Sequence, residues 1–203
     1  MTEKVKKKKK EPLHVTTVRA LFFAAVLSIA AFVFSFCFTW GIYQGKVEAQ
    51  AETDVFQTFD LATLDGGRLT AAELSSSKII FVNVWGTDCP PCIYELPDLE
   101  EVSKTFKQED LRIIGVPLDV TNGEEVNEDL LNEAKRLVET AGVTFSNVIP
   151  DQKMAGFLNS VIAATPTTFI LDSKGEILGS VTGSRDFDGW KETAEQYLAE
   201  GKQ

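Results

Sequence analysis

Apolar runs separated by polar turns predict most of the elements in this chain. The longest run, residues 20–45, has 26 residues without a charged side chain and is rich in Phe, Ala, Val and Leu. About 20 apolar residues are enough for a helix to cross a bilayer. The pattern therefore predicts a membrane anchor at residues 20–45, after a basic tail at residues 1–19 and before a polar linker at residues 46–54.

The flanking charges predict how this anchor is oriented. Residues 1–45 carry seven Lys or Arg, all of which precede the apolar run, and two Asp or Glu. Because basic residues stay on the cytoplasmic side, we expect a cytoplasmic N-terminus and an extracytoplasmic remainder. A cleaved signal peptide is the competing interpretation, since Ala49-Gln50-Ala51 has the small-x-small form of a cleavage site. The apolar run, however, exceeds the roughly 7–15 residues of a signal-peptide core.

The centre of the remaining segment, residues 55–203, is predicted as strand, helix, strand. A continuous apolar run at residues 78–85 indicates a buried strand. Residues 93–106 are predicted as a helix. Residues 111–118 are again apolar and predict a second buried strand, in which Pro117 should end the pairing.

The other elements of residues 55–203 follow from the same patterns. A hairpin is predicted over residues 56–69 around Asp65-Gly66-Gly67. A helix ending at Gly142 should bury one face, formed by Val126, Leu130, Ala134, Leu137 and Val138. After it we expect a strand at 143–149, a helix at 151–159, a hairpin with strands at 165–172 and 176–182, and a closing helix at 187–199. Alternating strands and helices imply an α/β domain with parallel strands, and the last hairpin adds an antiparallel edge.

The charge of the chain excludes one class of partner. The net charge is −10, and the residues after position 45 carry 13 basic and 28 acidic side chains, a net of −15. Because no basic patch is available to neutralise phosphates, we expect no nucleic-acid binding. The three cysteines are too few for a disulfide scaffold. Cys37 falls in the apolar run, where we expect it to act as an apolar residue of the anchor.

The candidate chemistry lies in Trp85-Gly86-Thr87-Asp88-Cys89-Pro90-Pro91-Cys92, between the first buried strand and the helix after it. Two residues separate Cys89 from Cys92, so their sulfur atoms are close enough to bond. The first sulfur lies at a helix N-terminus, where the backbone dipole favours a thiolate. This arrangement is suited to thiol–disulfide exchange.

Metal and haem sites fit this pair poorly. Zinc normally takes four ligands, and the predicted exterior domain has no third cysteine and no histidine. A c-type haem site needs histidine after the second cysteine, and Ile93 stands there. We therefore expect neither cofactor nor resident metal. A non-catalytic Cu(I) carrier remains an alternative, since two thiolates can bind Cu(I).

Three segments carry a resemblance to a known family: F-V-N-V-W-G-T-D-C-P-P-C-I-Y-E-L-P at 81–97, T-P-T-T-F-I-L-D-S-K-G-E-I at 165–177, and the hairpin with Asp65-Gly66-Gly67. Together they resemble the thioredoxin superfamily, and within it the membrane-anchored TlpA/ResA-like thiol-disulfide oxidoreductases. The resemblance implies a three-layer thioredoxin-like α/β fold with an N-terminal β-hairpin extension, preceded by one transmembrane helix. One departure is Asp88, where the family often has an aromatic residue.

The resemblance also implies roles for individual residues. Cys89 would be the exposed attacking thiolate and Cys92 the buried resolving thiol. Pro166 would be a cis proline facing the disulfide and would form a substrate groove with Thr165 and Trp85.

One further residue is a candidate for proton transfer. Glu95 lies three residues after Cys92, on the same helix face, and matches a family glutamate near the active site. Asn83 stands where many thioredoxins have a buried aspartate. We therefore expect Glu95 to relay protons to and from Cys92. The competing interpretation is an ordinary solvent-exposed helix glutamate.

The residues around Cys89 predict the direction of electron flow. Pro90 and Pro91 lack the N–H groups that would stabilise a Cys89 thiolate, and Asp88 adds a negative charge beside it. A less stabilised thiolate means a more stable disulfide, hence a reductant.

The resemblance implies a setting for this reductant. Exported cysteine-containing proteins, such as apo-cytochrome c, would be its substrates, and a membrane-embedded thiol donor would supply electrons. We expect a monomer. A peroxidase of the related redoxin group is an alternative, but its P-x-x-x-T-x-x-C pattern fails because Gly86 occupies the threonine position.

Overall fold

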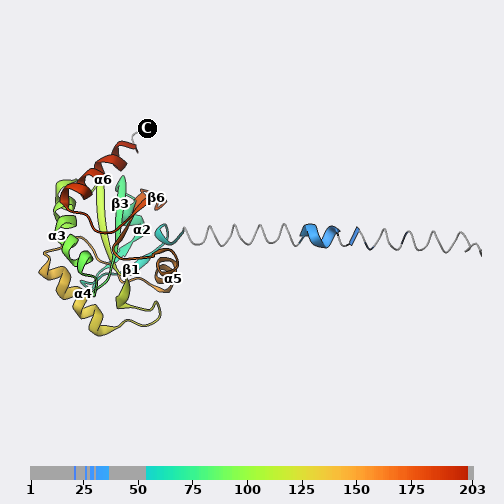
Figure 1. Ribbon diagram of the computed structural model, residues 1–203, viewed down its shortest axis with the longest axis horizontal. Coiled ribbons are helices and arrows are strands. Elements are labelled where there is room, and N and C mark those ends of the chain that lie inside the picture. The colour runs from blue at the N-terminus through green and yellow to red at the C-terminus, as the bar shows by residue number, and fades with distance from the viewer. Residues whose placement is uncertain (1–20, 22–25, 27, 30, 37–53, 201–203) are drawn as a thin grey trace, which may run out of the picture. The chain divides into compact units, whose positions relative to one another are not determined.

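The computed structural model describes residues 21, 26, 28, 29, 31–36 and 54–200 (Figure 1). The chain divides into two units, Met1–Ala49 and Gln50–Gln203. The described positions of the first unit are helical and exposed. Within the described residues, none of the helices has the length and apolar character needed to cross a bilayer. Most of the predicted anchor, Cys37 and the candidate cleavage site lie outside the described residues.

A four-stranded sheet forms the centre of the second unit (Figure 1). Strand β3 (Ile79–Trp85) pairs in parallel with β4 (Leu111–Pro117) and antiparallel with β5 (Thr167–Asp172). Strand β6 (Ile177–Thr182) pairs antiparallel with β5, so the order is β4-β3-β5-β6. The predicted parallel pairing is found between β3 and β4, and the predicted antiparallel hairpin is formed by β5 and β6; the central pair, β3 with β5, is antiparallel.

Helices cover both faces of this sheet. The helices are α3 (Pro90–Thr105), α4 (Glu128–Thr140), α5 (Gln152–Val161) and α6 (Phe187–Glu200). Figure 1 shows α3 and α6 on one side of the sheet and α5 on the other.

Alternate residues of β3 enter two different apolar clusters. Phe81 packs with residues of α3 and α6, whereas Val82 packs with residues of α5 and the N-terminal hairpin. Successive side chains of a strand point to opposite faces, so the apolar residues of β3, which is polar only at Asn83, fill two cores at once. The fold is therefore the three-layer α/β arrangement expected.

The N-terminal hairpin is also confirmed. Strands β1 (Asp60–Ala62) and β2 (Arg68–Thr70) pair antiparallel, and Gly66 adopts a positive φ of 88° in the turn. The hairpin leads into the single turn α2 (Ala71–Leu74), where Thr70 and Glu73 form a capping box. A short 3₁₀ turn, η1 (Asp54–Phe56), precedes the hairpin.

Two local predictions are wrong. Residues 143–149 form no strand of their own, only isolated bridges in which Val148 meets Thr63 and Asn147 meets Gly115. An apolar pattern alone does not supply a long pairing partner. Val126 was expected on a buried helix face, but it is 41% exposed and precedes α4. The Asn127 side chain accepts hydrogen bonds from the first backbone N–H groups of α4, so the helix begins after it.

Candidate active site around the Cys89–Cys92 disulfide

Cys89 and Cys92 form a disulfide at the start of α3. The S–S distance is 2.05 Å and the two Cα atoms are 5.3 Å apart. Cys89 is the N-cap residue of the helix and is 9% exposed, whereas Cys92 is 0% exposed. Both residues are buried, but only Cys89 keeps some exposed surface, so another molecule would approach the disulfide from the side of Cys89.

The first turn of α3 offers few donors to a Cys89 thiolate. Pro90 and Pro91 occupy the first two helical positions, and neither carries a backbone N–H. A helix N-terminus normally presents unpaired N–H groups to an anion at this point. The expected weakening of thiolate stabilisation by the two prolines therefore has a structural basis.

Hydrogen bonds to Asp119 hold the turn between β3 and α3. This residue lies in the short helix η2 (Leu118–Val120), directly after β4. Its Oδ2 accepts hydrogen bonds from the Thr87 backbone N–H at 2.8 Å and from the Thr87 hydroxyl at 2.5 Å. The backbone leading to Cys89 is thereby tied to the end of the neighbouring strand.

Trp85 occupies a different place from the one expected. Its side chain is 0% exposed and packs in one apolar cluster with Cys89 and Cys92. The indole Nε1 donates to Asn147 Oδ1 at 3.0 Å. A fully buried ring cannot form the surface of a substrate groove in this conformation, so Trp85 supports the disulfide from within the core instead.

Gly115 on β4 leaves room for the Trp85–Asn147 hydrogen bond, so replacing Gly115 should destabilise the fold. A Cβ atom at Gly115 would lie 1.9 Å from Asn147 Oδ1. We expect Gly115→Ala to lower the free energy of unfolding by roughly 1–3 kcal/mol, because the Trp85–Asn147 contact must shift. Urea denaturation measures this change. Gly156→Ala is the matched control, since a Cβ there meets no atom within 4 Å and lies within α5; equal losses in both variants would contradict the explanation.

Pro166 and Thr165 lie at the same end of the sheet as the disulfide. The Thr165–Pro166 peptide bond is cis. Strands β3 and β5 are antiparallel and Val84 pairs with Thr167, so Pro166, the residue before Thr167, lies at the level of Trp85. This is the end of β3 that leads to α3. Pro166 is buried and Thr165 is partly exposed. The position of these two residues is compatible with the groove that the sequence predicts.

Glu95 is buried, so the interpretation as an ordinary exposed helix glutamate is wrong. Glu95 is only 1% exposed to solvent. Oε1 accepts from Asn83 Nδ2 at 2.8 Å, and Oε2 accepts from the Arg185 backbone N–H at 3.2 Å and from Trp190 Nε1 at 3.3 Å. Asn83 Nδ2 also donates to Thr168 Oγ1 at 3.0 Å. The carboxyl group is thus held by β3, α6 and the loop before α6.

Burial decides the protonation of Glu95. Loss of solvent raises the pKa of the Glu95 carboxyl from 4.5 to about 7, and the nearby carboxylate of Asp98 acts in the same direction. The hydrogen bonds from Asn83, Arg185 and Trp190 favour the ionised form and limit the rise. A carboxyl group that gains and loses its proton near neutral pH is suited to general acid–base catalysis.

The sequence predicts a role for Glu95 but not most of its partners. Trp190 and Arg185 lie about 90 residues further along the chain, where no local pattern links them to Glu95. The one available signal was Asn83, whose amide in an otherwise apolar strand requires a polar partner.

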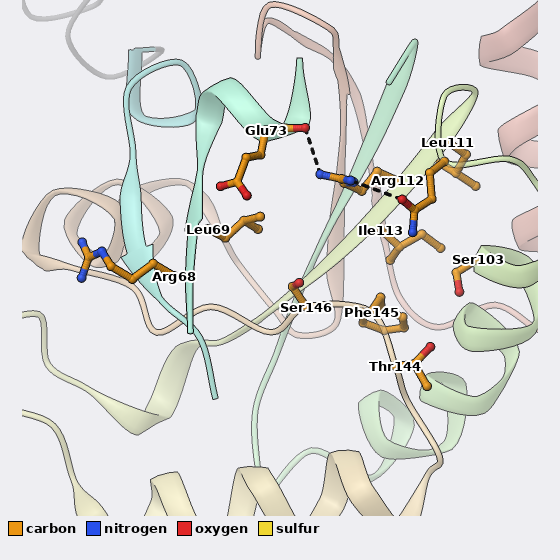
Figure 2. A pocket seen from close by; sticks show the side chains of 11 residues that line it. Arg68, Leu69, Glu73, Ser103, Leu111, Arg112, Ile113, Thr144, Phe145 and Ser146 are labelled. Carbon is orange, nitrogen blue, oxygen red and sulfur yellow. Dashed lines mark hydrogen bonds between the residues drawn. The ribbon is translucent and has the colours of Figure 1, made fainter. Parts of the chain in front are cut away.

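A hollow lies away from the disulfide, at the outer edge of β4 (Figure 2). Its two arginines already have protein partners. Arg112 donates to the Glu73 carbonyl at 2.9 Å and to Gln108 Oε1, and Arg68 pairs with Asp60. No cysteine lines this hollow of about 290 Å³. Among the described residues, no group of three or more His, Cys, Asp or Glu side chains is arranged to hold a metal ion.

Comparison with known proteins identifies the family. The AhpC/TSA family model matches residues 53–179, more than half of the chain. This protein belongs to the AhpC/TSA family. Among curated AhpC/TSA-like relatives, thiol-disulfide oxidoreductase ResA of Bacillus thuringiensis (strain Al Hakam) is 27% identical over 181 residues, which cover 89% of this chain and 95% of that protein. ResA of Bacillus subtilis (strain 168) is 28% identical over 144 residues, 70% of this chain and 73% of that protein.

Solved structures share the fold. A thiol:disulfide interchange protein of the thioredoxin family from Chlorobium tepidum TLS superimposes with a TM-score of 0.59 at 25% identity, covering 70% of this chain and 94% of that chain. StoA from Bacillus subtilis superimposes with a TM-score of 0.52 at 24% identity, covering 66% and 93%, and supports the fold. The predicted resemblance to ResA-like thiol-disulfide oxidoreductases is confirmed, and with it the enzyme class.

Proposed function

We propose that this AhpC/TSA-family protein is an extracytoplasmic protein disulfide reductase. The observation that carries the proposal is the Cys89–Cys92 disulfide at the start of α3, in which Cys89 keeps a small exposed surface and Cys92 has none. Residues 20–45 would anchor the enzyme in the membrane, with the basic tail in the cytoplasm. The similarity to ResA supports both the activity and this location.

The reduced enzyme would act in two exchange steps. The Cys89 thiolate attacks a substrate disulfide, a mixed disulfide forms, and the first substrate sulfur leaves as a thiolate that takes up a proton. Cys92 then loses its proton and attacks the Cys89 sulfur, which releases the second substrate thiol. Two electrons have passed to the substrate, and the enzyme holds the Cys89–Cys92 disulfide. A membrane-embedded dithiol would reduce it again.

Glu95 is the group that would move the proton of Cys92. It lies three residues after Cys92 on α3, and its pKa of about 7 lets it accept a proton and return it near neutral pH. As a carboxylate it would act as the base when Cys92 attacks, and as a carboxylic acid it would reprotonate Cys92 when the donor reduces the enzyme.

The substrate chain would lie across the exposed part of Thr165, next to the buried Pro166. Trp85 is not assigned to this surface because its side chain is buried. We propose exported cysteine-containing proteins as the substrate class, with apo-cytochrome c as a candidate, and a monomeric enzyme.

The reductive direction has a measurable consequence. We expect a reduction potential near that of thioredoxin, roughly −270 mV, because Pro90 and Pro91 withhold two donors from the Cys89 thiolate and so favour the disulfide. Equilibration of the full-length protein with glutathione or dithiothreitol buffers measures the potential. A value above about −180 mV would reverse the proposed direction and make the protein an oxidant.

Membership of the AhpC/TSA family keeps a thiol peroxidase as the second candidate. Gly86 stands three residues before Cys89, where the peroxidase pattern requires threonine. A steady-state assay with hydrogen peroxide separates the two candidates: turnover that exceeds disulfide reduction would favour the peroxidase. Retention of Cu(I) against a competing chelator, without reductase activity, would instead favour a copper carrier.

A further inference from the structure

Helix α6 connects to the candidate active site through one side chain. Trp190 lies in its first turn and is 0% exposed. Its ring packs 5.9 Å from that of Phe81 on β3, and its Nε1 donates to Glu95 Oε2 at 3.3 Å. A buried indole N–H needs an acceptor, and here the acceptor is the carboxyl group on α3.

The two oxygens of Glu95 are held from different directions. Oε1 accepts from Asn83 on β3, and Oε2 accepts from Trp190 and from the backbone N–H of Arg185. All three groups are donors. They are therefore best satisfied by a carboxylate, which can accept at every position, and less well by a carboxylic acid.

The charged groups around Glu95 lie on several elements. Asp98, one turn further along α3, raises the pKa of Glu95. The loop before α6 supplies Arg185 and Asp186, which line a small hollow of about 250 Å³ together with Glu95, Asp98 and Tyr94. The Arg185 guanidinium lies 5.8 Å from the centre of the Trp190 ring and donates to Thr193 rather than to Glu95. Through this hollow Glu95 can exchange protons with solvent.

We propose that Trp190 is a positioning residue of the redox reaction, whose indole N–H orients the Glu95 carboxylate to take the proton of Cys92. This inference rests on the proposed proton transfer between Glu95 and Cys92. It assigns to α6 a part in the second exchange step, in which Cys92 attacks Cys89.

The direction of the effect follows from hydrogen bonding. The Trp190 N–H favours the ionised form of Glu95 and lowers its pKa. Without this donor the carboxyl keeps its proton to higher pH, so a smaller fraction is available as a base near neutrality. The second exchange step should therefore slow at low pH and recover at high pH.

The test replaces Trp190 with phenylalanine, which retains an aromatic ring and removes the donor. Full-length reduced protein that carries Cys37→Ser, so that Cys89 and Cys92 are its only thiols, is mixed in detergent with 5,5′-dithiobis(2-nitrobenzoate), which has a single disulfide. Attack by Cys89 releases one thionitrobenzoate, and attack by Cys92 on the resulting mixed disulfide releases the second. The absorbance of the second phase therefore reports the Cys92 step by itself, across a range of pH.

We expect the second phase of Trp190→Phe to be about tenfold slower than that of the wild type near pH 6, and equal to it near pH 9. Tyr197→Phe removes a polar hydrogen from another aromatic residue of α6 and should leave the profile unchanged. Glu95→Gln should remove the pH midpoint, and adding Trp190→Phe to it should have no further effect.

The outcomes separate the inference from the proposed function. If Glu95→Gln retains the wild-type profile, the proposed proton transfer fails. If Glu95→Gln alters the profile and Trp190→Phe does not, the inference about Trp190 fails alone. Should Trp190→Phe not fold, NMR of the wild type provides the test: the Trp190 indole N–H resonance should titrate with the midpoint of the second phase and should not titrate in Glu95→Gln. If the chemical shift of this resonance does not change with that midpoint, the inference about Trp190 is wrong.

Discussion

Replacing Cys89 with serine should reduce disulfide-exchange turnover to the uncatalysed rate. Cys89 is the more exposed cysteine of the pair, and a serine hydroxyl neither ionises near neutral pH nor forms a disulfide. Reduction of insulin disulfides by the full-length protein, with dithiothreitol as the electron source, measures the loss against the background rate.

The two other cysteines of the chain sharpen this test. Cys92→Ala should retain the first exchange step and accumulate a mixed disulfide on Cys89, because the resolving thiol is gone. Trapping in cells, followed by mass spectrometry of the joined partner, would then identify the substrate. Cys37→Ser is the matched control and should leave turnover unchanged. Wild-type turnover by Cys89→Ser would contradict the proposed chemistry altogether.

Replacing Glu95 with glutamine should make the stability of the protein less dependent on pH. The pKa of Glu95 is about 7 in the folded protein and 4.5 as a reference for the unfolded chain. The folded state therefore binds this proton more tightly, and the stability that it contributes at low pH is lost as the pH rises from about 4.5 to about 7. The difference of 2.5 units between these values corresponds to roughly 3 kcal/mol.

Urea denaturation of oxidised wild type and Glu95→Gln at several pH values measures this effect. The free energy of unfolding of the variant, relative to that of the wild type, should increase by roughly 3 kcal/mol between pH 4.5 and pH 8. Glu101→Gln is the control on the exposed side of α3 and should show no such trend. A constant difference between wild type and Glu95→Gln would mean that burial does not govern the ionisation of Glu95.

Local patterns predicted the elements that carry the chemistry. The apolar runs located β3 and β4 to within a residue or two, because a strand covered on both faces carries apolar side chains at most of its positions. The C-x-x-C spacing predicted the Cys89–Cys92 pair, since two intervening residues at a helix start bring the sulfurs together. These features depend on neighbours in the chain.

The errors arose where distant contacts decide. Residues 143–149 carry a strand-like pattern, but they meet other segments only through isolated bridges. Trp85 precedes the active-site turn directly, yet the end of β3 directs its ring into the core, where Asn147 accepts its N–H. Neither outcome could be derived from residues close in sequence.

The sequence by itself determined the redox pair, the strands β3 and β4 with the helix between them, and a polar residue at position 83 that required a partner. Only the tertiary structure decided what surrounds Glu95. Its oxygens are held by Asn83, Arg185 and Trp190, which the chain brings together across as many as 95 residues. The physical reason is that the ionisation of a carboxyl group depends on its loss of solvent and on the donors that surround it, and both are properties of the packed protein.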